Sequence, residues 1–249
     1  MATNTTVQYL TLNLKDVSQH VAKKVLAAIG QNTWTELRDL RFAAGSLPTG
    51  FEGAFGPLLQ KNTSLRSLTL DSNSVGDAVV VAIADAMLEN QGTRLRDLNL
   101  NGTGIGAHAG DALARLLRKN CSLEALSSNE NELGASAGAA CFRALHENAG
   151  TKLRKLVLAE NGFGPAAGEA IAALLRSNRS LEWLALEHNT QLGDAAGAAL
   201  AGALRENAET RLQTLTLTNC GLGPKAGEGF AELLRSSRSL EELVLDGNP

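Results

Sequence analysis

The stretch that decides the fold runs from Leu153 to Ser180 and reads LRKLVLAENGFGPAAGEAIAALLRSNRS. Leucines at its first, fourth and sixth places predict a short strand with one apolar face, because successive strand residues point to opposite sides. The Ala- and Leu-rich residues 166–177 predict a helix, and Pro165 suits its first turn, where an N–H would have no helical acceptor. Asn178 follows at a place where a left-handed residue often ends a helix. Neither the strand nor the helix can bury its apolar face alone.

This unit recurs along the 249 residues of the chain. Repeats begin at Val7, Leu37, Leu65, Leu95, Leu123, Leu153, Leu181, Leu212 and Leu240. The intervals alternate between about 28 and about 30 residues, which indicates that a pair of repeats was duplicated. We predict one solenoid domain over residues 1–249. It would comprise a divergent N-terminal capping repeat (1–36), seven regular repeats (37–239) and a truncated final repeat (240–249).

Composition excludes several classes of protein. Hydrophobic residues make up 44% of the chain, enough for a substantial core, and the net charge of −3 argues against nucleic-acid binding, which needs a basic face. No run of 18 apolar residues predicts a membrane span, and the first residues lack the pattern of a signal peptide. Three scattered cysteines do not make a disulfide framework. We therefore expect a cytoplasmic protein that binds neither nucleic acid nor membranes.

The ninth place of most repeats is an asparagine, such as Asn161, and is Cys220 in the eighth repeat. We expect this side chain to hydrogen-bond the backbone of the turn, so that stacked repeats form a ladder inside the coil. Neighbouring strands lie about 4.8 Å apart, whereas packed helices lie about 8–10 Å apart. The stack should therefore curve, with strands on the inside and helices on the outside.

The motif LxxLxLxxNxLG, as in LRSLTLDSNSVG, LRKLVLAENGFG and LQTLTLTNCGLG, resembles the ribonuclease-inhibitor-like leucine-rich repeats. The resemblance covers about Val7 to Asn248. It implies an α/β leucine-rich-repeat solenoid, or horseshoe, that binds proteins, with a parallel β-sheet on the concave face and helices on the convex face. Two departures stand out: Ser128 replaces the third motif leucine of the fifth repeat, and the last repeat ends after its strand. We expect the first to weaken the core and the uncapped C-terminal end to allow self-association.

Three glycine-rich segments, GLGPKAG, GFGPAAG and GIGAHAG, superficially resemble phosphate-binding loops. None has the spacing of such a loop, and their recurrence at one place of the repeat favours a structural turn. The four histidines fall in different repeats, and no cysteine pair accompanies them, so metal-ligand spacing is missing. We expect no catalytic residue, no cofactor and no metal site, and we predict that the chain is not an enzyme.

The second, third, fifth, seventh and eighth motif places are expected to be exposed, as five columns along the concave face. From the fifth repeat onward these columns contain eight acidic and two basic residues. Trp183 lies in the third column, where an exposed tryptophan is typical of an interface anchor. The alternative is that it packs over neighbours such as Lys155 and Thr214. We predict that the partner-binding residues are Trp183, His188, Glu187, Glu160, Lys155, Glu130, Asp97, Arg66 and Glu242.

These features predict a non-catalytic protein–protein interaction module that binds a protein on its concave, C-terminally acidic face. The excess of carboxylates there favours a basic partner, because summed fields steer association. Two alternatives remain. One is a regulatory module such as a GTPase-activating or ligase-associated protein. The other is a structural scaffold of a cytoskeletal or ciliary assembly, bound through the convex helices or the open end.

Overall fold

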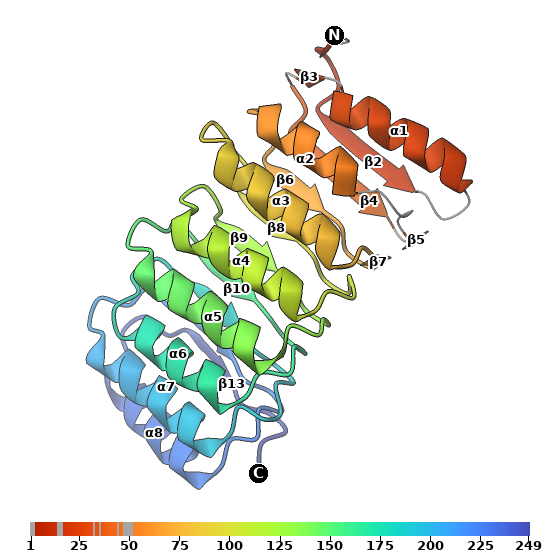
Figure 1. The fold of residues 1–249 in the computed structure, drawn as a ribbon. Helices are drawn as coiled ribbons and strands as arrows, with labels where there is room; N and C mark the ends of the chain where they lie inside the picture. The colour runs from red at the N-terminus through yellow and green to blue at the C-terminus, as the bar shows by residue number, and fades with distance from the viewer. Residues whose placement is uncertain (1–2, 14–16, 32, 35, 44, 47–51) are drawn as a thin grey trace.

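The computed structural model describes residues 3–13, 17–31, 33–34, 36–43, 45–46 and 52–249. Its helices follow one another in a single row, and a parallel sheet runs along the same row behind them (Figure 1). The two termini lie at opposite ends of the row (Figure 1). This arrangement confirms the predicted α/β solenoid, in which each strand is followed by a helix.

The main sheet of the described residues has nine parallel strands. They are β2 (Tyr9–Asn13), β4 (Asp39–Ala43), β6 (Ser67–Thr69), β8 (Asp97–Asn99), β9 (Ala125–Ser127), β10 (Lys155–Val157), β11 (Trp183–Ala185), β12 (Thr214–Thr216) and β13 (Glu242–Val244). Each strand pairs with that of the next repeat. The register steps are 30, 28, 30, 28, 30, 28, 31 and 28 residues, which are the intervals between the repeat starts. Two short pairs lie outside this sheet: β1 (Thr3–Asn4) with β3 (Thr33–Trp34), and β5 (Gly45–Ser46) with β7 (Asn73–Ser74).

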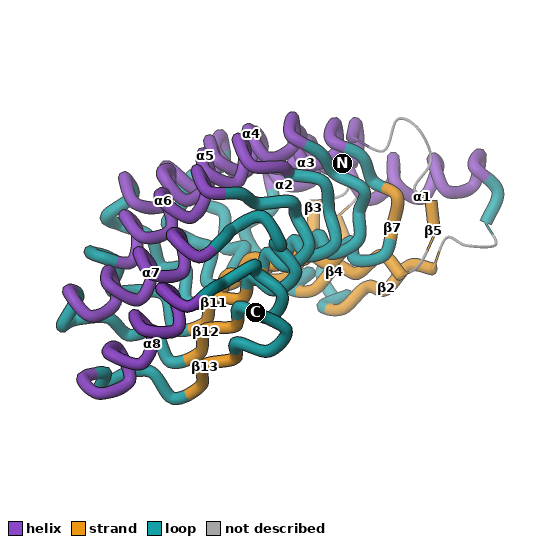
Figure 2. The backbone as a smooth tube through the Cα atoms, turned by 90° about the horizontal axis from the view of Figure 1, so that it is seen from below, coloured by secondary structure: helices purple, strands orange, loops and turns teal. Residues whose placement is uncertain are grey.

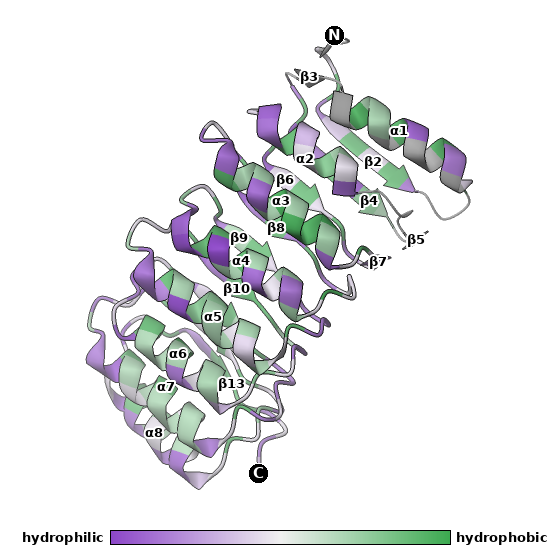
Figure 3. Ribbon diagram, viewed as in Figure 1, coloured by the Kyte–Doolittle hydropathy of each residue, from purple (hydrophilic) through white to green (hydrophobic). Residues whose placement is uncertain are grey.

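Helices cover one face of the sheet. They are α1 (Gln19–Gln31), α2 (Glu52–Lys61), α3 (Asp77–Glu89), α4 (Ala107–Lys119), α5 (Gly134–Glu147), α6 (Pro165–Leu175), α7 (Asp194–Glu206) and α8 (Pro224–Ser236). Each mixes hydrophobic and hydrophilic residues around its surface (Figure 3). In α4, for example, Leu113 and Leu116 are buried while Arg115 is exposed, as expected of a helix that rests on a core. No helix in the described part of the chain combines the length and apolar character needed to cross a membrane.

The motif leucines form the core between the sheet and the helices. Leu153, Leu156 and Leu158 are each at most 2% exposed, and the buried core is continuous from Ile29 to Leu233. Figure 2 shows the strands along the inner side of a curved array and the helices along its outer side. The predicted curvature is confirmed, and its cause is the closer spacing of strands than of helices.

The ladder of ninth-place side chains is present. Asn189 Nδ2 donates to the carbonyl of Leu158 in the preceding repeat (3.1 Å), and its Oδ1 accepts from the amide of Asn161 (3.2 Å). Cys220 Sγ takes the same place in the eighth repeat and donates to Leu186 O (3.2 Å). Because these groups are buried, the hydrogen bonds satisfy backbone atoms that water cannot reach. The ladder therefore joins successive turns, as expected.

The turn after the ladder residue takes two alternating forms. In the fourth, sixth and eighth repeats, the glycine directly after the ladder residue has φ between 65° and 68° (Gly104, Gly162 and Gly221). In the third, fifth and seventh repeats, the positive φ falls on the glycine where the helix begins (Gly76, Gly134 and Gly193). Glycine adopts such angles without a Cβ clash. The glycine-rich segments are thus turns of the fold. The two repeats of each duplicated pair differ in the geometry of this turn as well as in length.

The prediction that Asn178 ends a helix in a left-handed conformation is wrong, because Asn178 is not among the residues with positive φ. Its Oδ1 instead accepts hydrogen bonds from the amides of Ser180 (3.0 Å) and Leu181 (2.8 Å). Asn62 and Asn120 make the same bonds in their repeats. The side chain satisfies the amides that enter the next strand, so no left-handed residue is needed.

A second asparagine ladder, outside the leucine motif, joins the helix ends. Asn207 Nδ2 donates to the carbonyls of Leu175 (2.7 Å) and Asn178 (2.8 Å) in the preceding repeat. Asn90 and Asn148 make equivalent bonds in the third and fifth repeats. This ladder holds the loops between helices and strands in fixed positions along one edge of the sheet.

Candidate functional site

The strand register brings several predicted site residues into one row, here called the third-position row. From the fourth repeat onward it contains, in order, Asp97, Ala125, Lys155, Trp183, Thr214 and Glu242. These side chains lie on the inner face because strand residues alternate, and their neighbours Leu156 and Leu184 point into the core. Asp97, Lys155, Trp183 and Glu242 therefore lie on one continuous surface.

Trp183 agrees with both interpretations of its sequence position, an exposed side chain and one that packs over its neighbours. It is 40% exposed, yet Lys155 Nζ lies 4.8 Å from its ring centroid, which is cation–π geometry. On its other side in the register lies Thr214, which is only 8% exposed. Trp183 thus packs beside its neighbours and still presents part of its ring to solvent.

Lys155 also interacts with Asp97, because only the small Ala125 separates them in the row. Burial raises the pKa of the Asp97 carboxyl above its ordinary value; the Lys155 charge opposes this shift and the Asp39 charge adds to it. At the far end of the row, Glu242 Oε2 accepts a hydrogen bond from Thr214 Oγ1 (3.3 Å). The large side chains along this part of the row are therefore, in order, acidic (Asp97), basic (Lys155), aromatic (Trp183) and acidic (Glu242).

The expectation that the fifth motif place is exposed is wrong for the seventh and eighth repeats. Ala185 is 3% exposed and Thr216 is 7% exposed, because larger inner-face side chains cover these small residues. Glu187 reaches across to this row, and its Oε1 accepts a hydrogen bond from Thr216 Oγ1 (2.5 Å). Its Oε2 is buried and has no hydrogen-bond partner among the described residues.

Glu130, Glu160 and His188 lie together at the carboxyl ends of neighbouring strands, in the eighth motif place. Their φ angles are 55°, 53° and 60°, a left-handed conformation that is uncommon for residues other than glycine. All three side chains are exposed, and His188 Nδ1 lies 3.3 Å from Asn219 Nδ2. The turn into the ladder requires this backbone conformation, so these side chains project from the sheet edge in a fixed direction.

Ion pairs reduce the acidity that the sequence predicts for the inner face. Glu124 is paired with Arg96 (3.3 Å), and Glu182 is paired with Arg154 (2.7 Å). Among the described residues, the acids left without a basic partner in the C-terminal half of this face are Glu130, Glu160, Glu187, Glu241, Glu242 and Asp246. These six unpaired acids lie in the last five repeats.

Arg66 lies far from Trp183 and next to Asp97. It precedes β6, four strands away from Trp183 in the order of the sheet, and its carbonyl accepts a hydrogen bond from the amide of Asp97 (3.0 Å). Thr216 and Asn219 are the residues that sequence reasoning missed, since both are uncharged. Their contacts with Glu187 and His188 become visible only when successive repeats are aligned in register.

Among the described residues, no group of three or more His, Cys, Asp or Glu side chains is placed to hold a metal ion. Cys141 is 3% exposed and lies among helix side chains, where burial raises its thiol pKa to about 12. Burial also raises the thiol pKa of Cys220, to about 11. Both thiols therefore stay protonated at neutral pH, as expected of structural cysteines.

Comparison with known proteins extends this description. A family model for the Leucine Rich repeat matches residues 61–84 and 151–172. The chain is 33% identical over 96 residues to ribonuclease inhibitor of Sus scrofa, and 37% identical over 97 residues to the NACHT, LRR and PYD domains-containing protein 12 of Mus musculus. Each alignment covers 39% of this chain, but only 21% and 9% of the respective relatives.

Among solved structures, the tropomodulin C-terminal domain of Caenorhabditis elegans is similar to this chain with a TM-score of 0.50. The match covers 64% of this chain and 93% of that domain at 16% identity, and it shows the shared fold alone. Fold and repeats together define a leucine-rich-repeat solenoid. Within that class, the repeats are similar to those of ribonuclease inhibitor, as the motif predicts.

Proposed function

We propose that this chain is a non-catalytic protein-interaction module whose inner sheet surface binds a protein partner around Trp183. The main support is that Trp183, although on a sheet strand, is 40% exposed. Tryptophans that become fully buried on binding often contribute most of the binding energy. The Lys155 ammonium already restrains the ring, so little side-chain freedom would be lost when a partner covers it.

The proposal extends to the charge of the partner. The exposed carboxylates Glu130, Glu160 and Glu242 lie on the same inner surface as Trp183 and have no basic partner among the described residues. Lysine or arginine side chains of the partner would pair with them in charge-assisted hydrogen bonds. Association should be steered by these charges and should slow as salt increases.

The test compares three versions of the chain. Trp183→Ala/Glu160→Lys changes the inner surface, and Leu234→Ala/Glu228→Lys makes equivalent changes on the outer helix α8, where Leu234 is 58% exposed. Proteins captured by each version are compared by quantitative mass spectrometry, and the captured partner is then titrated in purified form. We expect the inner-surface variant to weaken binding by about 30-fold or more, and the outer variant to bind as wild type.

The opposite pattern would contradict the assignment. A partner lost from the α8 variant but retained by the inner-surface variant would favour the scaffold alternative, with binding through the outer helices. The regulatory alternative makes a different prediction. Purified chain would then stimulate nucleotide hydrolysis by a GTPase, or ubiquitin transfer by a ligase, that co-purifies with it.

We also propose self-association through the C-terminal end of the sheet. There β13 is an edge strand, and Leu240, Leu243 and Leu245 are only half-buried. Unpaired strand edges with apolar neighbours favour pairing with another chain. Light scattering after size-exclusion chromatography tests this, because a mass of 26.1 kDa at high concentration would contradict it.

A cytoplasmic location is proposed on the basis of the cysteines. All three are free in the structure, and disulfides characterise oxidising compartments. Microscopy of the tagged chain in its own cells tests the location, and a signal confined to a secretory compartment would contradict it.

A further inference from the structure

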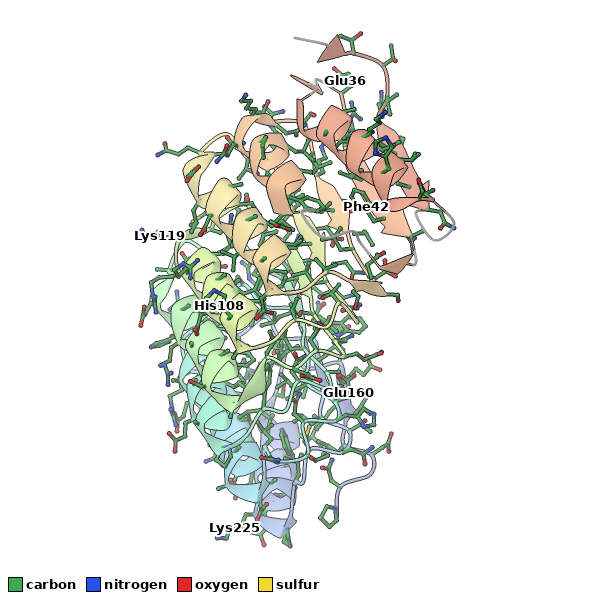
Figure 4. All side chains as sticks on the ribbon, turned by 45° about the vertical axis from the view of Figure 1, so that its right-hand side comes forward. Glu36, Phe42, His108, Lys119, Glu160 and Lys225 are labelled. Atoms are coloured by element: carbon green, nitrogen blue, oxygen red, sulfur yellow. The ribbon has the colours of Figure 1, made fainter. Side chains whose placement is uncertain are left out.

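A pocket of about 680 Å³ lies at the sheet edge opposite Glu160, where α3 and α4 end and β8 and β9 begin. Met87 and Leu88 of α3 contribute its apolar part. Its remaining wall comes from the loops that enter β6, β8, β9 and β10, so it is built by residues of the third, fourth and fifth repeats. Figure 4 shows Lys119, which lines the pocket, and Glu160 on opposite edges of the molecule.

The pocket is strongly basic. Its charged lining residues are Arg66, Arg94, Arg96, Lys119 and Lys152, opposed by the single acid Glu124. Five cations and one carboxylate give a formal charge of +4. Glu124 is paired with Arg96, and the other four cations have no carboxylate within ion-pair distance in the described part of the chain.

This lack of partners contrasts with the helices beside the pocket. Arg115 and Arg118 of α4 are each paired with an acid of a neighbouring helix, at 3.0 Å and 2.6 Å. Lys119 directly follows Arg118 and has no such partner among the described residues. Four of the five basic residues that line the pocket therefore carry a charge with no carboxylate partner among the described residues.

The backbone around the pocket is held in place before any ligand binds. Asn90 Nδ2 donates to the carbonyls of Leu59 (2.7 Å) and Asn62 (2.8 Å), and Asn120 Oδ1 accepts from the amide of Leu123 (2.8 Å). The Asn90 bonds belong to the second asparagine ladder, and the Asn120 bond is the one that Asn178 makes to Leu181 in its own repeat. A site whose loops are already ordered loses less conformational freedom on binding.

We propose that this pocket binds a short segment of a partner protein that is rich in Asp and Glu. Guanidinium groups bind carboxylates through paired hydrogen bonds, and lysines add point charges. The pocket volume falls within the range of about 300–1,000 Å³ that is usual for ligand sites. This site is separate from the surface around Trp183 and goes beyond the proposed function, because it selects partners of the opposite charge.

The charge pattern of the molecule favours an acidic peptide over nucleic acid. The chain has a net charge of −3, and along the second motif place the basic Arg66 and Arg96 give way to Glu182 and Glu241. A continuous phosphate backbone leaving the pocket toward the C-terminal half would meet these acids, whereas binding to nucleic acid relies on an extended basic surface. A short acidic segment ends within the basic region.

The chain provides its own probe of occupancy. Cys121 lines the pocket and is exposed, whereas Cys141 and Cys220 are buried. Alkylation of the native protein with iodoacetamide, followed by peptide mass spectrometry, therefore reports on the pocket alone. The ligand probe is a fluorescein-labelled peptide of eight glutamates, and its neutral control is the corresponding glutamine peptide.

Fluorescence anisotropy should show that the glutamate peptide binds the wild-type chain and that the glutamine peptide does not. Lys119→Glu/Lys152→Glu should weaken this binding by about 10-fold or more. Arg143→Glu/Arg235→Glu changes the net charge equally on exposed outer-helix positions and should change the affinity by less than about 2-fold. The glutamate peptide should also slow alkylation of Cys121. Circular dichroism checks that both double variants are folded.

Several results would overturn the proposal: equal binding of the glutamine peptide, equal loss in both double variants, or unprotected Cys121 at saturating peptide. Tighter binding of a single-stranded oligonucleotide of equal charge would also overturn it in favour of nucleic acid. Trp183→Ala should leave binding of the glutamate peptide unchanged. Failure here is thereby distinguished from failure of the proposed inner-surface site.

Discussion

Ser128 is the residue at which a polar group interrupts the stack of motif leucines. It is fully buried, and its Oγ accepts a hydrogen bond from Asn131 Nδ2 (3.1 Å). Asn131 Nδ2 also donates to the carbonyls of Leu100 (2.8 Å) and Asn129 (3.0 Å). The amide would therefore keep two acceptors if the hydroxyl were removed, and the main loss at Ser128 is that of buried methyl groups.

We predict that Ser128→Leu raises the free energy of unfolding by about 1–3 kcal/mol, because additional apolar volume is buried where the neighbouring repeats have Leu100 and Leu158. Urea denaturation monitored by circular dichroism measures the change. Ser127→Leu, on the adjacent inner-face position, is the matched control and should give little gain. An unchanged or lower stability of Ser128→Leu would show that the hydroxyl contact matters more than the missing methyl groups.

Asp97 provides a pH-dependent prediction. Burial raises the pKa of the Asp97 carboxyl above the ordinary value of 3.8. Folding therefore favours the neutral carboxyl, and the charged carboxylate lowers the stability of the fold once the pH exceeds the folded-state pKa. Asp97→Asn should therefore raise the melting temperature at about pH 7. The difference should vanish at about pH 3, where Asp97 is protonated in both states. Differential scanning fluorimetry measures both, with Asp111→Asn on helix α4 as control.

At the scale of elements, helices are capped from the preceding repeat. The residues before α4 and α8 are glycines, which offer no capping side chain. Asp77 at the start of α3 supplies the acceptor instead, with Oδ1 at 2.6 Å from the amide of Gly106. Asp194 at the start of α7 likewise accepts from the amides of Gly223 (3.0 Å) and Ala226 (2.7 Å). Each such aspartate ties two neighbouring repeats together.

Ala135 occupies the corresponding place in the fifth repeat and offers no acceptor to α6. A Cβ added at Gly164, the residue before α6, would lie 3.7 Å from Ala135 Cβ, so the two elements are close enough for this contact. Ala135→Asp should stabilise the chain by about 1 kcal/mol, the usual effect of a helix N-cap. Ser136→Asp is the control, because it adds the same charge one residue later. Equal melting temperatures for Ala135→Asp and wild type would contradict the prediction.

The cap at Asp194 should also respond to pH. The hydrogen bond from the Ala226 amide is the main cause that lowers the pKa of the Asp194 carboxyl. A lowered folded-state pKa means that the stabilisation is present above the unfolded-state pKa and is lost as pH falls through the folded-state value. Asp194→Asn should therefore lower the melting temperature at neutral pH, and the difference should shrink in acid. A difference that is constant with pH would contradict this account.

At the scale of the whole molecule, stability depends on contacts between neighbouring repeats, because each unit packs only against those beside it. Leu156 has repeats on both sides and is 0% exposed. Leu243 is the equivalent residue of the edge strand β13 and is only partly buried. The same leucine position is thus tested in two environments.

We predict that Leu156→Ala lowers the free energy of unfolding by about 2–5 kcal/mol and that Leu243→Ala costs about half as much, since less surface is removed from water in the native state. Urea denaturation of both variants measures this difference. Hydrogen exchange should in addition show that β13 amides exchange faster than β10 amides. Equal costs for the two variants would indicate that the edge strand is covered in solution.

The sequence by itself determined the architecture, because a solenoid is built from contacts that recur at a fixed period. The spacing of Leu153, Leu156 and Leu158 specifies an apolar strand face, and the alternating repeat lengths reappear as register steps in the sheet. The ladder place and the curvature follow from the same period. Asn178 shows the limit of this reasoning, because its backbone conformation depends on side-chain hydrogen bonds to Ser180 and Leu181.

Only the tertiary structure decided which inner-face side chains are free to bind. The pairing of Glu124 with Arg96, the burial of Thr216 and the contact of Lys155 with Trp183 each join residues of different repeats. The basic pocket combines side chains from three repeats at the ends of helices and the starts of strands. A repeat motif predicts whether each position faces the core or the inner surface. The contacts between repeats depend instead on how far a long side chain reaches across the roughly 4.8 Å between strands, and on which residue it meets there.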